Sequence, residues 1–278
     1  MKKTLTVLLS GILATGALVV TASAEASAEV YVSVADENGS LVLAREKVTV
    51  TDINGDGTLD IDEALYAAHE AGYSGEDGYE AYDGDYGRAI RKLWGVDNGG
   101  SYSYYVNNAS AMSLNDTVKD GDHVYAYLYT DLTAWSDTYS FFDTDTAKAG
   151  QGEKLTLTLS AAGFDESFAP ITLPVEGAVI TLNGEATEYV TDSEGKVEIS
   201  ISDTGSVVIS AVSDTMTLVP PVCIAEISEK EASSDTAAEV SKNNPDTGVE
   251  SVAVFGGLAM VAACAVYCVR NSVRKNEK

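Results

Sequence analysis

The sequence is poor in basic residues and in histidine. Against 43 Asp and Glu it has 17 Lys and Arg and two His, for a formal net charge of −26. Nucleic-acid binding rests on Lys and Arg that neutralise phosphates, so this imbalance excludes nucleic acid as a partner. The motifs of a zincin helix, a nucleophile elbow and a P-loop are absent, as is a Cys/His pair. These absences predict a protein that is not an enzyme.

Long apolar runs occur only at the two ends of the sequence. At the start, Lys2 and Lys3 precede an apolar stretch over Leu5–Val20, and Ala22-Ser23-Ala24 offers a small-residue cleavage site. A basic region, an apolar region and an A-x-A site in this order are typical of a secretory signal peptide. We therefore expect residues 1–24 to be a signal peptide and the rest of the chain to be exported.

The second apolar run covers residues 252–269, and basic residues from Arg270 onward follow it. Its 18 residues span roughly 27 Å as a helix, just enough for a bilayer core. A short pentapeptide containing proline precedes the run: Asn244, Pro245, Asp246, Thr247 and Gly248. One interpretation is an ordinary C-terminal membrane anchor.

This order of pentapeptide, apolar helix and basic stop resembles the cell-wall sorting signal of sortase substrates in Gram-positive bacteria. The resemblance covers residues 244–278 and implies that a sortase cuts between Thr247 and Gly248 and joins the chain to peptidoglycan. Asn244 stands where the family usually has Leu, which leaves the sortase class open. The implied location is extracellular, on the cell wall of a Gram-positive bacterium, with sortase and peptidoglycan as partners.

Between the two ends the charge imbalance grows and cysteine almost disappears. Two of the 17 basic residues precede this segment and four follow it, while two of the 43 acidic residues follow it, so 11 basic face 41 acidic residues for a net charge of −30. Cys223 is the one cysteine in the segment. A disulfide within the exported chain is therefore excluded, and core burial or a bound metal must stabilise the domains.

Residues 25–147 predict an α+β domain. Val30, Val32 and Val34 alternate, which is typical of a strand, and Leu65, Ala68 and Ala71 give a helix its apolar face. The expected elements are two strands over 29–51, a helix over 61–71, a loop over 72–87, a short helix over 88–94 and strands over 102–106, 123–130 and 139–142.

The order strand, strand, helix, strand, strand is that of a β-grasp fold. The segments Trp94-Gly95, Tyr105-Val106-Asn107-Asn108 and Asp120-Gly121-Asp122 resemble the transcobalamin C-terminal-like domain of exported bacterial proteins. This resemblance implies a small cofactor, such as a corrinoid or haem, as one ligand.

Residues 148–227 predict an all-β sandwich. Short alternating segments such as Leu155–Leu159 and Val197–Ile201 are separated by turn signals every 8 to 12 residues. The hairpin sequence Thr191–Val197 resembles that of bacterial Ig-like surface modules. Residues 228–243 are charged, rich in Ala and Ser and almost free of large apolar groups, which predicts a disordered stalk. The expected chain is thus α+β, then all-β, then a stalk and one C-terminal hydrophobic helix.

Residues 52–63 fit the twelve-position EF-hand loop, which binds Ca²⁺ through oxygen atoms. Gly57 holds the sixth position, where the loop turns sharply. The loop follows a strand and has no second copy, which resembles a half-hand of the dockerin type more than a paired sensor. An Asx-rich turn without metal is the alternative. The candidate metal ligands are Asp52, Asn54, Asp56, Thr58 through its carbonyl, Asp60 and Glu63.

Aromatic residues supply the candidate ligand surface. Twelve of the 15 tyrosines fall between Tyr66 and Tyr139, and aromatic rings with polar tips suit glycan, flat-cofactor or protein partners, although they also suit a sheet core. The candidate ligand-binding residues are Tyr79, Tyr82, Tyr86, Trp94 and Tyr105.

The resulting hypothesis is a wall-anchored, calcium-binding surface protein that displays a non-catalytic ligand-binding or adhesion module. Its ligand could be a corrinoid, haem, a glycan or a host protein. The alternative is a structural pilus or wall-assembly subunit without a small ligand.

Overall fold

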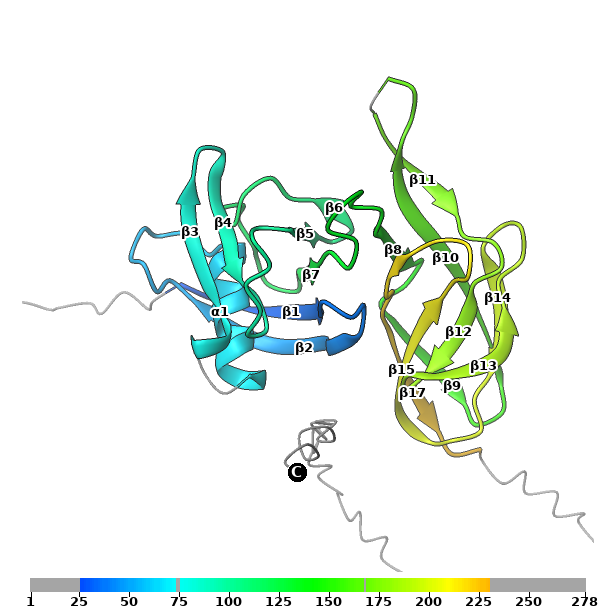
Figure 1. The fold of residues 1–278 in the computed structure, drawn as a ribbon. Helices are drawn as coiled ribbons and strands as arrows, with labels where there is room; N and C mark the ends of the chain where they lie inside the picture. The colour runs from blue at the N-terminus through cyan, green and yellow to red at the C-terminus, as the bar shows by residue number, and fades with distance from the viewer. Residues whose placement is uncertain (1–25, 74–75, 168, 231–278) are drawn as a thin grey trace, which may run out of the picture. The chain divides into compact units, whose positions relative to one another are not determined.

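The structure is a computed structural model that describes residues 26–73, 76–167 and 169–230 (Figure 1). The expected signal peptide, sorting signal and nearly all of the stalk lie outside the described residues. All described residues belong to one compact unit, which ends at Glu231. Among them, no helix has both the length and the apolar character needed to cross a membrane. The described chain is mainly β, with one α-helix.

The part of this unit that precedes residue 131, here called the N-terminal lobe, contains a mixed five-stranded sheet in the order β2-β1-β7-β5-β6. β1 pairs antiparallel with β2 and parallel with β7. These pairings place β1 and β7, the first and last strands of this lobe, side by side within the sheet. The elements are β1 (Ser27–Ala35), β2 (Leu41–Thr51), α1 (Ile61–Gly72), β5 (Tyr102–Val106), β6 (Ala109–Ser110) and β7 (His123–Leu128).

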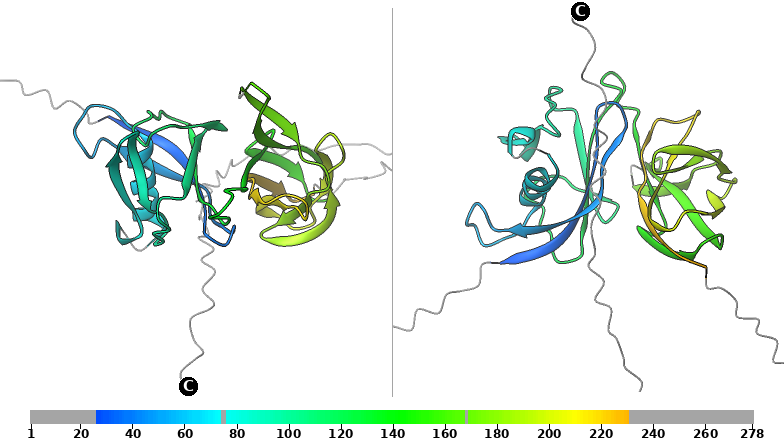
Figure 2. Two further views of the ribbon diagram at one scale, coloured as in Figure 1. Left: turned by 45° about the horizontal axis from the view of Figure 1, so that its top comes forward. Right: turned by 90° about the horizontal axis from the view of Figure 1, so that it is seen from below.

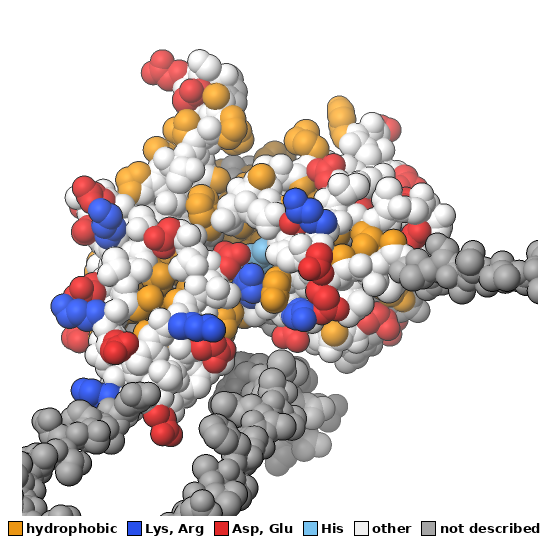
Figure 3. All heavy atoms as spheres, turned by 180° about the vertical axis from the view of Figure 1, so that it is seen from behind, with side chains coloured by type: hydrophobic (Ala, Val, Ile, Leu, Met, Phe, Trp, Pro, Cys, Tyr) orange, Lys and Arg blue, Asp and Glu red, His pale blue; other side chains and the backbone are white. Residues whose placement is uncertain are grey.

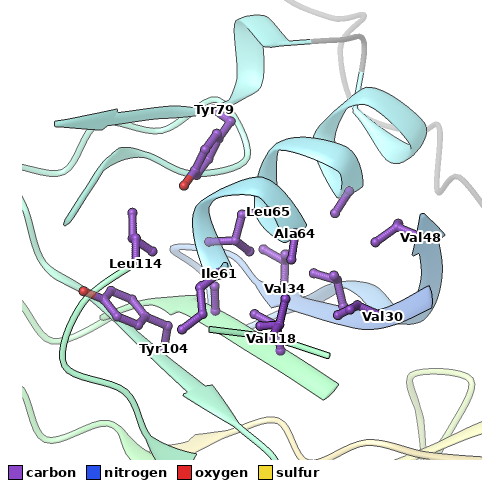
Figure 4. Close-up of a cluster of buried hydrophobic side chains, with 14 of the residues drawn as sticks. Val30, Val34, Val48, Ile61, Ala64, Leu65, Tyr79, Tyr104, Leu114 and Val118 are labelled. Carbon is purple, nitrogen blue, oxygen red and sulfur yellow. The ribbon is translucent and has the colours of Figure 1, made fainter. Parts of the chain in front are cut away.

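Helix α1 covers one face of this sheet (Figure 2). Figure 4 shows Ile61, Ala64 and Leu65 of α1 facing the valines of β1. All three helix residues are fully buried, as the alternating valines of β1 are. Each of the buried Val, Ile and Leu side chains among them contributes about 1.5–3 kcal/mol through burial. The predicted helix and the two predicted strands before it are thereby confirmed, except that Ala71 is exposed instead of buried.

The segment after α1 differs from the prediction. Neither the loop over 72–87 nor the helix over 88–94 is present: a 3₁₀ turn, Glu76–Gly78, leads into the hairpin β3 (Glu80–Gly84) and β4 (Gly87–Lys92). Ala81 lies opposite Ile90, and both pack on the core. Asp83 lies opposite Arg88 and forms an ion pair with it. These cross-strand pairs stabilise strands that the Gly- and Tyr-rich composition does not predict.

The C-terminal lobe, residues 138–228, consists of two further five-stranded sheets around a second core. One sheet has the path β11-β10-β8-β16 with β14 beside β10, and the other has the order β13-β12-β15-β17-β9. Its strands are β8 (Thr138–Phe142), β9 (Thr146–Gly150), β10 (Lys154–Phe164), β11 (Pro170–Pro174), β12 (Val179–Leu182), β13 (Glu185–Val190), β14 (Lys196–Ser200), β15 (Gly205–Val212), β16 (Leu218–Val219) and β17 (Cys223–Ser228).

Period-two alternation forms this second core. Leu157 and Leu159 of β10 are fully buried. On the neighbouring β14, Val197 lies opposite Leu157 and Ile199 lies opposite Leu155. The strand at 138–142, which the sequence places with the first domain, pairs with β10 and β16. The all-β prediction for this region is confirmed as a sandwich of packed sheets.

Candidate functional site

The predicted calcium loop connects β2 to α1 and is held by its own backbone. The two carboxylate oxygens of Asp52 accept hydrogen bonds from the N–H groups of Gly55, Asp56 and Gly57 at 2.7, 3.1 and 2.8 Å. Asn54 Oδ1 accepts from the Asp56 N–H at 2.8 Å. These are Asx-type turns, which side chains of Asp and Asn favour. The acidic side chains therefore curl the chain around themselves.

Two glycines permit this curl. Gly55 and Gly57 have φ of +77° and +86°, in the left-handed region that side chains with a Cβ rarely adopt. A Cβ at either position would meet no atom within 4 Å. The requirement is therefore for backbone conformation and not for space.

The end of the loop forms the start of α1. Asp60 is the N-cap: its Oδ1 accepts from the Glu63 N–H at 3.0 Å, and Glu63 Oε2 accepts from the Asp60 N–H at 3.3 Å. This is a capping box, which satisfies two N–H groups at the helix start. Asp60 is only 2% exposed. Burial, with further repulsion from nearby carboxylates, raises the pKa of Asp60 to about 6.

The loop residues have the types and the order that an oxygen-ligated cation requires, but their side chains do not surround a common point. Among the described residues, no three His, Cys, Asp or Glu side chains form a group that could hold a metal ion. The Glu63 carboxylate points back to the loop and accepts from the Ile53 N–H at 2.6 Å. Burial also raises the pKa of Glu63. Bidentate metal binding by Glu63 would exchange these backbone hydrogen bonds for metal–oxygen bonds.

Three of the five candidate ligand-binding residues pack against other residues of the chain: Tyr79 is buried, and Trp94 and Tyr105 are half-buried. Tyr79 is buried and its hydroxyl donates to Asp62 at 2.6 Å. The Trp94 ring packs edge-on against His69, with 5.1 Å between ring centroids. Tyr105 stacks on Tyr139 with 3.7 Å between ring centroids. We therefore assign these three rings to packing.

The other two candidates remain at the surface. Tyr86 is 98% exposed at the turn between β3 and β4, and Tyr82 on β3 is 42% exposed. Met112 is 84% exposed. Two residues after Met112, the Leu114 N–H donates to the Arg88 carbonyl of β4 at 2.9 Å, which connects this segment to the hairpin. We call Tyr82, Tyr86 and Met112 the hairpin patch. Met112 was not predicted, because nothing in the sequence places it near the tyrosines.

The tyrosine-rich strand β7 also has a structural role. Tyr125 and Tyr127 are buried in a cluster with Tyr139, Val219 and Val222 of the C-terminal lobe. The Tyr125 hydroxyl donates to the Pro220 carbonyl at 2.6 Å. These aromatic rings hold the two lobes in contact and are not available to an external ligand.

His69 is fully buried and uses both ring nitrogens. Leu65 O lies 2.6 Å from Nδ1, and the Trp94 N–H donates to Nε2 at 3.0 Å. Because a carbonyl only accepts, Nδ1 carries the hydrogen and the ring is neutral. Burial lowers the pKa of His69 to about 4. His69 therefore fastens α1 to the turn after β4, and neither nitrogen is available to an iron or cobalt centre.

A second histidine lies in a constellation that sequence reasoning missed. Ser33 Oγ is 2.8 Å from His123 Nε2, and His123 Nδ1 is 3.1 Å from Asp145 Oδ2. This order of groups is that of a Ser-His-Asp triad. Ser33, however, is fully buried and its Oγ already accepts the Arg45 N–H at 2.9 Å. No substrate can reach that oxygen, so the constellation joins β1, β2 and β7 to the C-terminal lobe.

Comparison with known proteins adds a distant likeness only. No protein-family model matches the chain, and no curated protein matches it. Solved structures of the N-terminal four Ig domains of Dscam1 are similar: isoform 6.9 at 11% identity and a TM-score of 0.20, over 55% of this chain and 36% of that one. Isoform 8.4 is 12% identical at a TM-score of 0.21, over 80% and 46% of the two chains. This chain thus spans less than half the length of either, and its fold assignment depends on the sheets described above.

Proposed function

We propose that this chain is a calcium-binding surface protein, anchored to the cell wall of a Gram-positive bacterium, that displays a non-catalytic ligand-binding module. The observation that carries the proposal is the hairpin patch. Tyr82 and Tyr86 on the β3–β4 hairpin and Met112 in the segment after β6 are large side chains left open to solvent, and exposed aromatic groups of this kind are typical of recognition surfaces.

The surroundings of the patch support recognition over folding. The hairpin is fastened to the rest of the lobe by the Arg88–Asp62 ion pair near its turn and by the core contacts of Ala81 and Ile90. Its exposed rings contribute nothing to these contacts. On the face shown in Figure 3, acidic side chains are spread over the surface with basic side chains among them. A ligand is therefore selected by the aromatic groups of the patch more than by a single charged region.

Calcium binding by residues 52–63 is the second part of the proposal. Oxygen donors at the EF-hand spacing, the left-handed Gly57 and the Asx turns of Asp52 support it. The ligands would be Asp52, Asn54, Asp56, the Thr58 carbonyl, Asp60 and Glu63. Because the loop ends in the N-cap of α1, a bound cation would stabilise the junction of β2 and α1. Its role would be structural.

The proposed domain families and the proposed cell-wall anchoring rest on the sequence resemblances. The parallel pairing of β1 with β7 and the α1 cover are consistent with a β-grasp domain of the transcobalamin C-terminal-like kind, and the sandwich is consistent with an Ig-like spacer. Anchoring rests on the sequence of residues 244–278, in which the pentapeptide is followed by the apolar run and the basic stop. A corrinoid, haem, a glycan and a host protein remain the ligand classes to test.

The test uses residues 26–231, the unit that contains every core cluster described here. Haem and cobalamin are titrated by absorbance, and glycans are screened on an array. We expect one ligand class to bind saturably and a Tyr82→Ser/Tyr86→Ser variant to lose that binding. Val190→Ser removes a comparably exposed apolar side chain from β13 and should bind normally. Full binding by the double variant would refute the role of the patch.

A further inference from the structure

The outer edge of β2 is a free sheet edge. β2 is the terminal strand of the N-terminal sheet, and within the described chain no strand pairs with it on the side away from β1. An uncovered edge presents a row of backbone N–H and C=O groups that can pair with another strand. The question is which residues of β2 present these groups.

The hydrogen bonds of β1 identify them. Glu29 accepts from the Gly121 N–H, and the Tyr31 N–H donates to Asp122, so both residues direct their backbone groups away from β2. Backbone groups alternate in direction along a strand. Val30 therefore bonds with its partner Val48 on β2. It follows that Lys47, Thr49 and Thr51 of β2 direct their N–H and C=O groups to the free edge.

A groove lies along the same edge. It has a volume of about 450 Å³ and lies between β2 and the outer side of α1. Val48, Ala67 and Ala71 give it apolar walls, and Ile53, which is 55% exposed, lies in its lining. The small alanines of α1 leave room beside the strand. Free backbone groups next to an apolar groove are the arrangement in which an extended peptide adds to a sheet.

Charge restricts the occupant. The chain has a formal net charge of −26, so two copies repel each other and a basic partner is attracted. Two charged side chains line the groove, Lys47 and Glu70. Lys47 is paired with Glu29 at 2.8 Å, which leaves the exposed Glu70 to meet a cationic side chain.

We propose that the outer edge of β2 binds an extended basic peptide segment as an additional strand. Apolar side chains at alternate positions of the peptide enter the groove beside Val48 and Ala67, and a Lys or Arg at one of these groove-facing positions meets Glu70. The inference goes beyond the function proposed above: it uses neither the hairpin patch nor a bound cation.

The probe is a fluorescein-labelled octapeptide, Val-Lys-Val-Lys-Lys-Lys-Val-Lys, whose alternate groove-facing positions include one Lys. It is titrated into residues 26–231 in EDTA and followed by fluorescence anisotropy. EDTA keeps the result independent of the calcium proposal. We expect saturable binding to the wild type. Thr49→Pro removes an N–H that the β1–β2 ladder does not use and should weaken binding about tenfold or more. The matched control Thr49→Val keeps that N–H and should bind within about threefold of the wild type.

Two further measurements make the result decisive. Glu70→Lys reverses one exposed charge and should weaken binding several-fold; if Thr49→Pro fails to fold by circular dichroism, this variant decides alone. Equal affinity of the wild type and Glu70→Lys, or of the wild type and a folded Thr49→Pro, would overturn the proposal. So would the absence of saturable binding, or a wild-type dimer in sedimentation that Thr49→Pro abolishes, which would assign the edge to a second copy.

Discussion

The two lobes make their turns in different ways. Six non-glycine residues of the described chain have a positive φ, and five of them precede the C-terminal lobe: Arg45, Trp94, Asn107, Asn108 and Trp135. In the C-terminal lobe the left-handed positions belong to glycines, with Asn183 the exception. A non-glycine residue in this region is uncommon and is stored strain unless its surroundings compensate.

The strained positions of the N-terminal lobe are compensated by specific hydrogen bonds. The Trp94 N–H donates to His69, and the Arg45 N–H donates to Ser33. Asn107 donates to Asp122 and accepts from the His123 N–H. Both lobes place glycines at left-handed positions. The N-terminal lobe depends in addition on polar side chains that fix an irregular backbone, whereas the sandwich depends on glycine and apolar alternation. The calcium loop, the hairpin patch and the β2 edge all belong to the irregular lobe.

The sharpest test of this contrast is Gly195→Ala in the sandwich. Gly195 has φ +74°, and a Cβ there would lie 2.3 Å from the Leu159 carbonyl oxygen. Strain and overpacking together should lower the free energy of unfolding by about 2–4 kcal/mol in urea titrations. Gly184→Ala is the control: its φ is +85° with no atom within 4 Å, so it should cost only roughly 1 kcal/mol. Equal losses would show that close packing at Gly195 does not matter.

In the N-terminal lobe the corresponding test is the pH dependence of His69. Its pKa is about 4 because burial disfavours the charged ring, whereas unfolded His titrates near 6.5. The unfolded chain thus takes up a proton first as the pH falls. The stabilising effect is complete above pH ~6.5, and it declines as the pH falls to about 4, by ~3 kcal/mol in total.

His69→Gln removes this titration. As the pH falls from 7 to 4, the free energy of unfolding of this variant should rise by up to ~3 kcal/mol relative to that of the wild type. The reason is that only the wild type loses stability through protonation of the unfolded histidine. Denaturant titrations at several pH values measure the difference, and other titrating groups cancel between the two proteins. Parallel pH profiles for the two proteins would contradict the neutral, doubly bonded histidine described here.

Calcium should stabilise the N-terminal lobe by a smaller amount. An extracellular EF-hand type site has a Kd of roughly 10⁻⁴–10⁻³ M, so 10 mM Ca²⁺ should add about 1.4–2.7 kcal/mol by mass action. Thermal melts with Ca²⁺ and with EDTA give the effect. Glu63→Gln keeps acceptor oxygen for the Ile53 N–H but removes the charge, and it should abolish the response. Glu70→Gln, on the exposed side of the same helix, should respond like the wild type. A response retained in Glu63→Gln would place the cation elsewhere.

Much of the fold could be predicted because its signals are local. The valines of β1 alternate in the sequence and are buried in the structure, and the Asp60 and Glu63 spacing marks the start of α1. The hairpin β3–β4 could not be predicted, because its strands are defined by pairs such as Asp83 with Arg88, which composition does not reveal. A Gly- and Tyr-rich segment resembles a loop until its partner strand is known.

The site residues show the same division. The calcium-loop residues are close in sequence, so their hydrogen bonds follow from the loop itself. Tyr79 and Tyr105 are covered by Asp62 and Tyr139, which lie far away along the chain. How far each ring is covered depends on long-range contacts, and for Tyr105 on the other lobe. Aromatic content therefore predicts that a ligand surface could exist but not which rings form it.

The smallest expected effect on stability belongs to Tyr86. Its side chain is 98% exposed, so Tyr86→Ser should change the free energy of unfolding by no more than about 0.5 kcal/mol. Tyr79→Phe, in the same lobe, removes a buried hydroxyl that donates to Asp62 and should cost roughly 1–3 kcal/mol. If Tyr86→Ser proved as destabilising as Tyr79→Phe in urea titrations, the ring would serve packing, and the hairpin patch would lose its most exposed member. If Tyr86→Ser leaves the free energy of unfolding unchanged, the exposed ring adds nothing to the stability of the fold. Contact with a ligand would then explain why a large aromatic side chain lies in solvent.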